Sequence, residues 1–130
     1  MKAISVSHKP DGLSRLPAAV AARLRPYIHA LVRAIQPSQL ILFGSQACGR
    51  ATADSDFDLL FIRSDHRSPK AGNMQARRVI STVAAAPESF TLLTKTPGEI
   101  EEKLRQRSPL YCDIMDQGLV LYAEKTNIRD

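Results

Sequence analysis

The chain lacks tryptophan and has only three tyrosines, four phenylalanines and two cysteines in 130 residues. With so few aromatic side chains, a surface that stacks nucleic-acid bases is not favoured. The two cysteines, Cys48 and Cys112, lie far apart and neither has a CxxC or Cys-His neighbour. We therefore expect free thiols rather than a disulfide framework or a zinc site, and this cysteine usage predicts a cytoplasmic location.

Long apolar runs are also missing. No segment approaches the roughly 18 uncharged apolar residues of a membrane-spanning helix, so no membrane partner is expected. The N-terminal stretch MKAISVSHKPDG lacks the apolar centre of a signal peptide. With 44% hydrophobic residues, a chain of this length is typical of one globular domain with a buried core.

Acidic residues are fewer than basic ones. Eighteen Lys and Arg against thirteen Asp and Glu give a formal net charge of +5. Such a charge favours anionic partners, whether nucleotide, RNA or an acidic protein face. Because the basic residues are scattered along the chain, we expect most of them on solvated helix faces. Nucleic-acid binding stays open but is not favoured.

The apolar periodicity predicts an α/β (α+β) fold, in which helices flank a small mixed sheet. Residues 1–15 are expected to form a flexible arm, 16–124 a single domain and 125–130 a tail. Pro26 lies inside the first predicted helix and indicates either a kink or two abutting helices. Residues 64–73 are polar and predict a loop over the functional site. Strands are expected at 40–43, 57–62, 89–94 and 119–122, and helices at 17–36, 46–49, 74–86, 97–107 and 110–116.

The most informative segment is LILFGSQACGRATADSDFDLLFI, residues 40–62. Asp56 and Asp58 stand at i and i+2 where the second apolar run begins, so a strand would point both side chains to one face. Two like charges held that close repel, and a divalent cation with oxygen ligands, most often Mg²⁺, is the natural counter-charge. Gly44 allows close backbone approach to a ligand, and Ser45 can start a helix whose N–H groups favour phosphate. The segment therefore predicts a site for a nucleoside triphosphate.

A plainer interpretation is also open. Gly44 and Ser45 can form an ordinary turn, and the two aspartates can face solvent. Asp is depleted in strands, however, and Asp58 stands directly before four consecutive apolar residues, which favours the metal site.

The spacing of this segment resembles a known signature. Gly-Ser, ten residues and then Asp-x-Asp are similar to the nucleotidyltransferase superfamily that includes DNA polymerase beta, and the string GSQACGRATADSDFDLL looks most like its minimal nucleotidyltransferase branch. The resemblance implies that Asp56 and Asp58 are catalytic ligands of Mg²⁺ and that Gly44 and Ser45 contact the phosphates of ATP or another nucleoside triphosphate. Arg50 would add charge near the leaving pyrophosphate, although a solvated loop arginine fits equally well.

One position departs from that family. Its members usually supply a third carboxylate from the neighbouring strand, and alignment places Thr91 there. Glu88 is nearby but shares a strand face with Phe90 and Leu92, opposite Thr91, so only a bulge would bring it to the site. Thr91 at this position is more compatible with bound triphosphate and one metal ion than with fast transfer.

Two functions follow from the resemblance. The first is a Mg²⁺-dependent enzyme that transfers a nucleoside monophosphate, AMP from ATP, to a protein or nucleic-acid hydroxyl. Such proteins often act as the antitoxin to a small helical partner of the HEPN type. The alternative is a catalytically weak or inactive subunit that binds nucleotide and neutralises a partner by contact.

Overall fold

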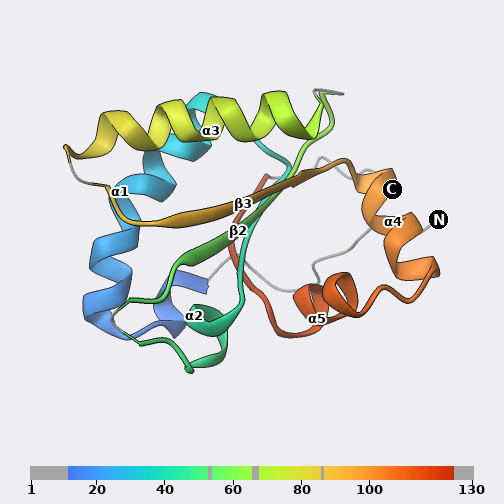
Figure 1. Ribbon diagram of the computed structural model, residues 1–130, viewed down its shortest axis with the longest axis horizontal. Helices are drawn as coiled ribbons and strands as arrows, with labels where there is room; N and C mark the ends of the chain where they lie inside the picture. The colour runs from blue at the N-terminus through green and yellow to red at the C-terminus, as the bar shows by residue number, and fades with distance from the viewer. Residues whose placement is uncertain (1–11, 53, 66–67, 86, 125–130) are drawn as a thin grey trace.

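The computed structural model describes residues 12–52, 54–65, 68–85 and 87–124, which form an α+β domain (Figure 1). Residues 1–11 of the expected N-terminal arm and the tail 125–130 lie outside the described residues. The predicted fold class is confirmed. In chain order the elements are the 3-10 helix η1 (Gly12–Arg15), α1 (Ala18–Ile35), β1 (Gln39–Phe43), α2 (Ser45–Cys48), β2 (Phe57–Ile62), α3 (Pro69–Val83), β3 (Phe90–Lys95), α4 (Pro97–Arg105), α5 (Pro109–Gln117) and β4 (Leu119–Ala123).

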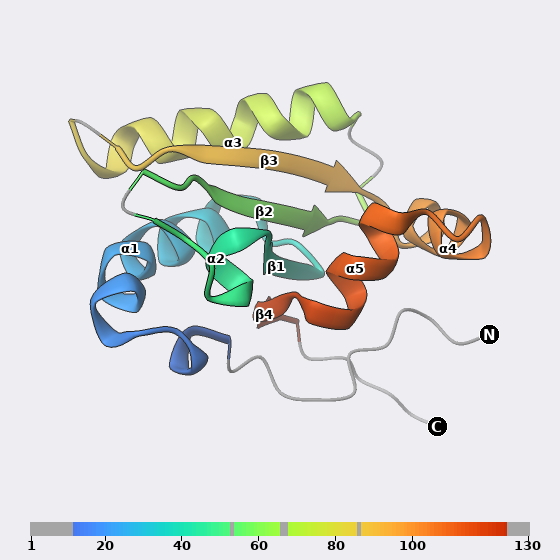
Figure 2. The same cartoon turned by 60° about the horizontal axis from the view of Figure 1, so that its bottom comes forward.

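The sheet is mixed, with the strand order β3-β2-β1-β4. β1 pairs antiparallel with both β2 and β4, while β2 and β3 are parallel and are joined through α3. α1 and α3 pack on one face of the sheet, and α4 and α5 pack on the other. Figure 2 shows α3 and α5 on opposite sides of the strands.

Strand alternation decides which side chains reach which layer. Leu59 and Phe61 of β2 belong to the core under α1 and α3, whereas Leu60 and Ile62 belong to the core under α4 and α5. Asp58 is two residues from Leu60, so it lies on the α4–α5 face of the sheet. The candidate carboxylate therefore points away from α1 and α3.

α1 is one continuous helix with Pro26 inside it, so the expectation of two abutting helices is wrong. Pro26 is exposed, and the apolar side of the helix is buried on both sides of it through Leu24, Ile28 and Leu31. Packing of this apolar side holds the helix together where proline removes one backbone hydrogen bond.

The expected loop over the site is also corrected. Ser68 caps α3 by accepting a hydrogen bond from the Ala71 N–H at 3.1 Å, and Pro69 occupies the first turn, so helix starts well before residue 74. This segment follows the carboxyl end of β2, whereas Asp56 precedes its amino end. The described residues of this segment, 64–65 and 68–73, therefore leave the sheet at the end opposite the aspartates, and they do not cover them.

η1 belongs to the folded part of the chain, although its residues fall within the expected arm. Gly12 is buried, and the element packs against β4. The packed part of the described chain thus begins before residue 16.

Among the described residues, no helix is long and apolar enough to cross a membrane. Cys48 and Cys112 are both free thiols, as expected from their spacing.

Candidate functional site

Gly44 joins β1 to α2 in a conformation that only glycine adopts readily, with φ 79° and ψ −157°. A β-carbon on Gly44 would overlap Oδ2 of Asp58 and would lie 3.0 Å from its Cγ. The missing side chain therefore makes room for a carboxylate directly against the turn. Ser45 begins α2, and the Ala47 and Cys48 N–H groups donate back to the Gly44 carbonyl oxygen at 3.1 and 3.2 Å.

Asp58 lies between two neighbouring strands. It is opposite Phe43 of β1 and beside Thr91 of β3 in the parallel register. Burial raises the pKa of its carboxyl above the ordinary value, the charge of Asp56 raises it further, and a hydrogen bond from the Thr91 side chain opposes the rise. Asp58 is thus a half-buried carboxylate whose negative charge is poorly compensated by the surrounding protein.

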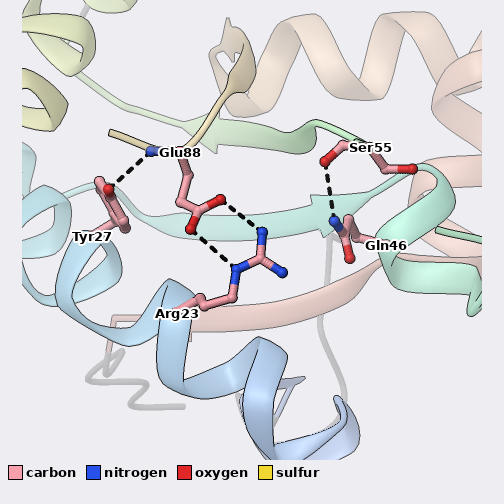
Figure 3. A network of polar contacts seen from close by, with 5 residues as sticks. All are labelled: Arg23, Tyr27, Gln46, Ser55 and Glu88. Carbon is pink, nitrogen blue, oxygen red and sulfur yellow. Dashed lines mark hydrogen bonds and ion pairs between the residues drawn. The ribbon is translucent and has the colours of Figure 1, made fainter. Parts of the chain in front are cut away.

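Asp56 is exposed and directly precedes β2, close enough for its charge to act on Asp58. Its loop is held in place by Gln46, a buried α2 residue whose Nε2 donates to the Ser55 carbonyl oxygen at 3.3 Å (Figure 3). The Thr52 N–H also donates to Ser55 Oγ at 2.8 Å. The sequence analysis did not identify Gln46 as part of the site. The signal that could have indicated it is a polar residue directly after Gly-Ser.

Glu88 is engaged elsewhere. Its carboxylate accepts hydrogen bonds from Arg23 of α1 at 2.7 and 3.1 Å, and its N–H donates to the Tyr27 hydroxyl at 3.0 Å (Figure 3). The bond to Arg23 lowers the pKa of Glu88 below its ordinary value. Glu88 thus points toward α1, while Thr91 occupies the position beside Asp58, in agreement with the predicted register.

The Arg50 side chain is exposed, and the backbone N–H of Arg50 donates to the Ser45 carbonyl oxygen at 3.0 Å. Together with Gly44 it lines a hollow of about 110 Å³ that α5 closes from the other side. The structure thus brings Gly44 and Arg50 together, although they are six positions apart. Asp113 of α5 also lines this hollow.

The donor set suits one hard cation better than a closed metal centre. Among the described residues, no group of three or more His, Cys, Asp or Glu side chains is placed to hold a metal ion. Asp56 and Asp58 offer two carboxylates, and Thr91 beside Asp58 adds a hydroxyl. Mg²⁺ is commonly bound by one or two carboxylates together with substrate phosphates, so these residues fit it.

Comparison with known proteins identifies a family for the chain. No curated protein matches the chain. Among solved structures, a toxin–antitoxin crystallised with AMP-PNP is similar, with a TM-score of 0.52 and 24% identity over 76% of this chain and 73% of that chain, and this likeness shows the fold. The family model described as "Nucleotidyltransferase domain" matches residues 24–129, a range that contains Gly44, Asp56, Asp58 and Thr91. On this match, the chain belongs to the nucleotidyltransferase domain family.

Proposed function

We propose that this protein binds a nucleoside triphosphate with Mg²⁺ and transfers the nucleoside monophosphate, AMP from ATP, to a hydroxyl of a protein or nucleic-acid acceptor. The observation that carries the proposal is the half-buried carboxylate of Asp58, which lies against the Gly44 turn with Asp56 nearby. The backbone of this turn favours glycine at position 44, and a β-carbon there would overlap the carboxylate. A domain gains no stability from two repelling carboxylates, so their placement favours a ligand that neutralises them.

Each residue has a role in this proposal. Asp56 and Asp58 hold the cation, and Gly44 lets the triphosphate approach the backbone at the start of α2. Arg50, which lines the same hollow as Gly44, stabilises the charge of the leaving pyrophosphate. Bound Mg²⁺ would supply charge neutralisation at the phosphates and at the attacking hydroxyl.

The protein partner is part of the proposal. The similar toxin–antitoxin was crystallised with AMP-PNP, an ATP analogue, which supports ATP as the nucleotide and an antitoxin role for this chain. The acceptor would then be a small helical partner of the HEPN type. In this proposal, the partner supplies the acceptor hydroxyl.

A second function rests on Thr91. The residue beside Asp58 in β3 is a neutral hydroxyl, so the described site has two carboxylates where related enzymes usually have three. With a single well-held cation, the protein would bind nucleotide and partner but transfer slowly or not at all.

ATP labelled on different phosphates tests the transfer. The protein is incubated with Mg²⁺, the protein encoded beside it and ATP labelled at the α- or the γ-phosphate. Nucleotidyl transfer moves the α label to the acceptor and leaves the γ label in pyrophosphate. Transfer of the γ label instead would identify a kinase and would contradict the proposed reaction. Nucleotide binding without transfer of either label supports the second function.

Thr91→Asp should rebuild the third carboxylate. Without metal, the added charge beside Asp58 should lower the free energy of unfolding by about 1 kcal/mol. With Mg²⁺ and ATP, this repulsion is neutralised, so the variant should gain more thermal stability from them than the parent does. Any slow transfer should become faster.

Glu88→Gln is the matched control, because it changes a carboxylate that bonds to Arg23 on the other side of the sheet. It should leave nucleotide binding unchanged and reduce stability only modestly, since this ion pair is partly exposed. If Glu88→Gln abolishes transfer and Thr91→Asp changes nothing, Glu88 is the third acid and our assignment of Thr91 is wrong.

A further inference from the structure

Helices α1 and α3 contain basic residues and no acidic residue. Neither helix contains Asp or Glu over the ranges 18–35 and 69–83. In contrast, α4 and α5 on the opposite side of the sheet contain five acidic residues. Six of the eighteen Lys and Arg residues therefore lie in two helices that contain no acidic residue. The basic residues of the α1–α3 layer, all exposed, are Arg23, Arg25, Arg33, Lys70, Arg77 and Arg78.

Helices α1 and α3 lie side by side (Figure 1). Between them is a shallow, open groove of about 420 Å³. Small and apolar side chains, here called the floor, line it together with one arginine from each helix, Arg33 of α1 and Arg78 of α3. Over the described stretches of the chain, neither arginine has an acidic partner, unlike Arg23, which pairs with Glu88. The full lining is Ala30, Arg33, Ala34, Arg78, Val79 and Thr82.

The groove and the candidate nucleotide site are separated by the sheet. Asp58 and Thr91 lie on the α4–α5 face, whereas the groove is on the outer side of the layer that covers the other face. Arg33 and Arg78 therefore do not contribute to triphosphate binding. A ligand in the groove can also bind without blocking the nucleotide site.

We infer that this groove, the α1–α3 groove, docks an amphipathic helix of a partner protein, whose apolar stripe contacts Ala30, Ala34 and Val79 and whose flanking Asp or Glu residues pair with Arg33 and Arg78. The apolar floor and the two arginines without acidic partners match the apolar stripe and the acidic flanks of such a helix. This inference goes beyond nucleotide transfer and does not depend on it.

Two other occupants fit less well. A nucleic-acid backbone would pair with the arginines but would leave the apolar floor without a partner, and no aromatic side chain lines the groove for base stacking. A second copy could present its acidic α5, but that contact joins two different surfaces, and such contacts extend into chains unless they close into a ring. A helix from a different protein can contact the apolar floor and pair with both arginines.

A designed peptide tests the groove directly. The probe is a fluorescein-labelled helical peptide of about 18 residues, or five turns, with a Leu/Ala stripe flanked by Glu, and a second peptide has Gln in place of Glu. The Glu peptide should bind one to one, more weakly as salt rises, and should shift the amide NMR signals of Ala30, Ala34 and Val79. The Gln peptide should bind about tenfold more weakly.

Two variants of the protein separate the groove from net charge. Arg33→Gln with Arg78→Gln should weaken binding of the Glu peptide about tenfold. Lys103→Gln with Arg105→Gln removes the same charge from α4 and should leave binding within about twofold of the parent. Ala34→Phe, at an exposed position, should block binding by filling the groove while both arginines remain.

Three results would overturn the inference. The first is equal peptide binding by the parent and by the Arg33/Arg78 variant, or no binding by either protein. The second is an RNA duplex that displaces the peptide and shifts the same amide signals at lower concentration. The third is self-association of the parent in sedimentation velocity that Arg33→Gln with Arg78→Gln abolishes, because the occupant would then be a second copy.

Discussion

Gly44→Ala should lower the free energy of unfolding by about 3 kcal/mol or more and should abolish triphosphate binding. Two effects add. The backbone at Gly44 adopts a region that other residues avoid, and the new β-carbon would overlap the Asp58 carboxylate. Chemical denaturation measures the first consequence, and calorimetric titration with ATP and Mg²⁺ measures the second.

Two further variants separate these effects. Gly49 also has a positive φ, 75°, but a β-carbon there meets nothing within 4 Å, so Gly49→Ala should cost only about 1 kcal/mol. Adding Asp58→Ala to Gly44→Ala removes the overlap and should recover part of the lost stability without restoring binding. Equal losses from Gly44→Ala and Gly49→Ala would mean that Asp58 is not lodged against the turn.

Asp58→Asn is expected to have opposite effects on stability and on binding. The affinity for ATP in Mg²⁺ should fall about 100-fold or more, because an amide does not neutralise the cation. Without metal, the variant should be as stable as the parent at neutral pH or slightly more stable, since repulsion from Asp56 disappears. Asp116→Asn, an exposed change of the same kind on α5, should alter neither property.

The pH dependence gives this prediction a second measurement. Burial and the charge of Asp56 raise the pKa of Asp58, so the folded protein holds this proton more tightly than the unfolded chain does. The contribution of Asp58 to the free energy of unfolding is therefore highest at low pH. It falls as pH rises from the unfolded pKa of about 3.9 through the folded value. Asn cannot titrate, so the stability of the variant minus that of the parent should increase over this window. A difference that stays flat or decreases would show that Asp58 is not a strained carboxylate.

The local part of the site could be predicted from sequence because neighbours in the chain build it. The strand alternation that orients Asp58 and the turn at Gly44 both depend on residues within a few positions of each other. The register beside Thr91 also followed from sequence, since the helix start after β3 fixes the numbering along that strand.

Features that depend on distant segments were not predicted. Arg23 and Glu88 are 65 positions apart, and nothing local in either segment indicates their pairing. The same holds for the α1–α3 groove, because Arg33 and Arg78 come to line one groove only when the two helices pack together. The expected loop over the site was wrong for a related reason. Its polar composition suggested a loop, but Ser68 caps a helix that starts at Pro69, and the direction of β2 places the segment at the end of the sheet away from the aspartates.

Replacing Mg²⁺ with Mn²⁺ tests the central claim most directly, because the unpaired electrons of Mn²⁺ broaden the NMR signals of nearby amides. In the presence of ATP, substoichiometric Mn²⁺ should first broaden the signals of Gly44, Ser45, Asp58 and Thr91. The signals of Ala34 and Val79, across the sheet in the α1–α3 groove, should stay sharp, and Asp58→Asn should abolish the broadening. Broadening that is centred elsewhere, for example at Asp113 and Asp116 of α5, or that persists unchanged in Asp58→Asn, would contradict a nucleotide–metal site at the Gly44 turn.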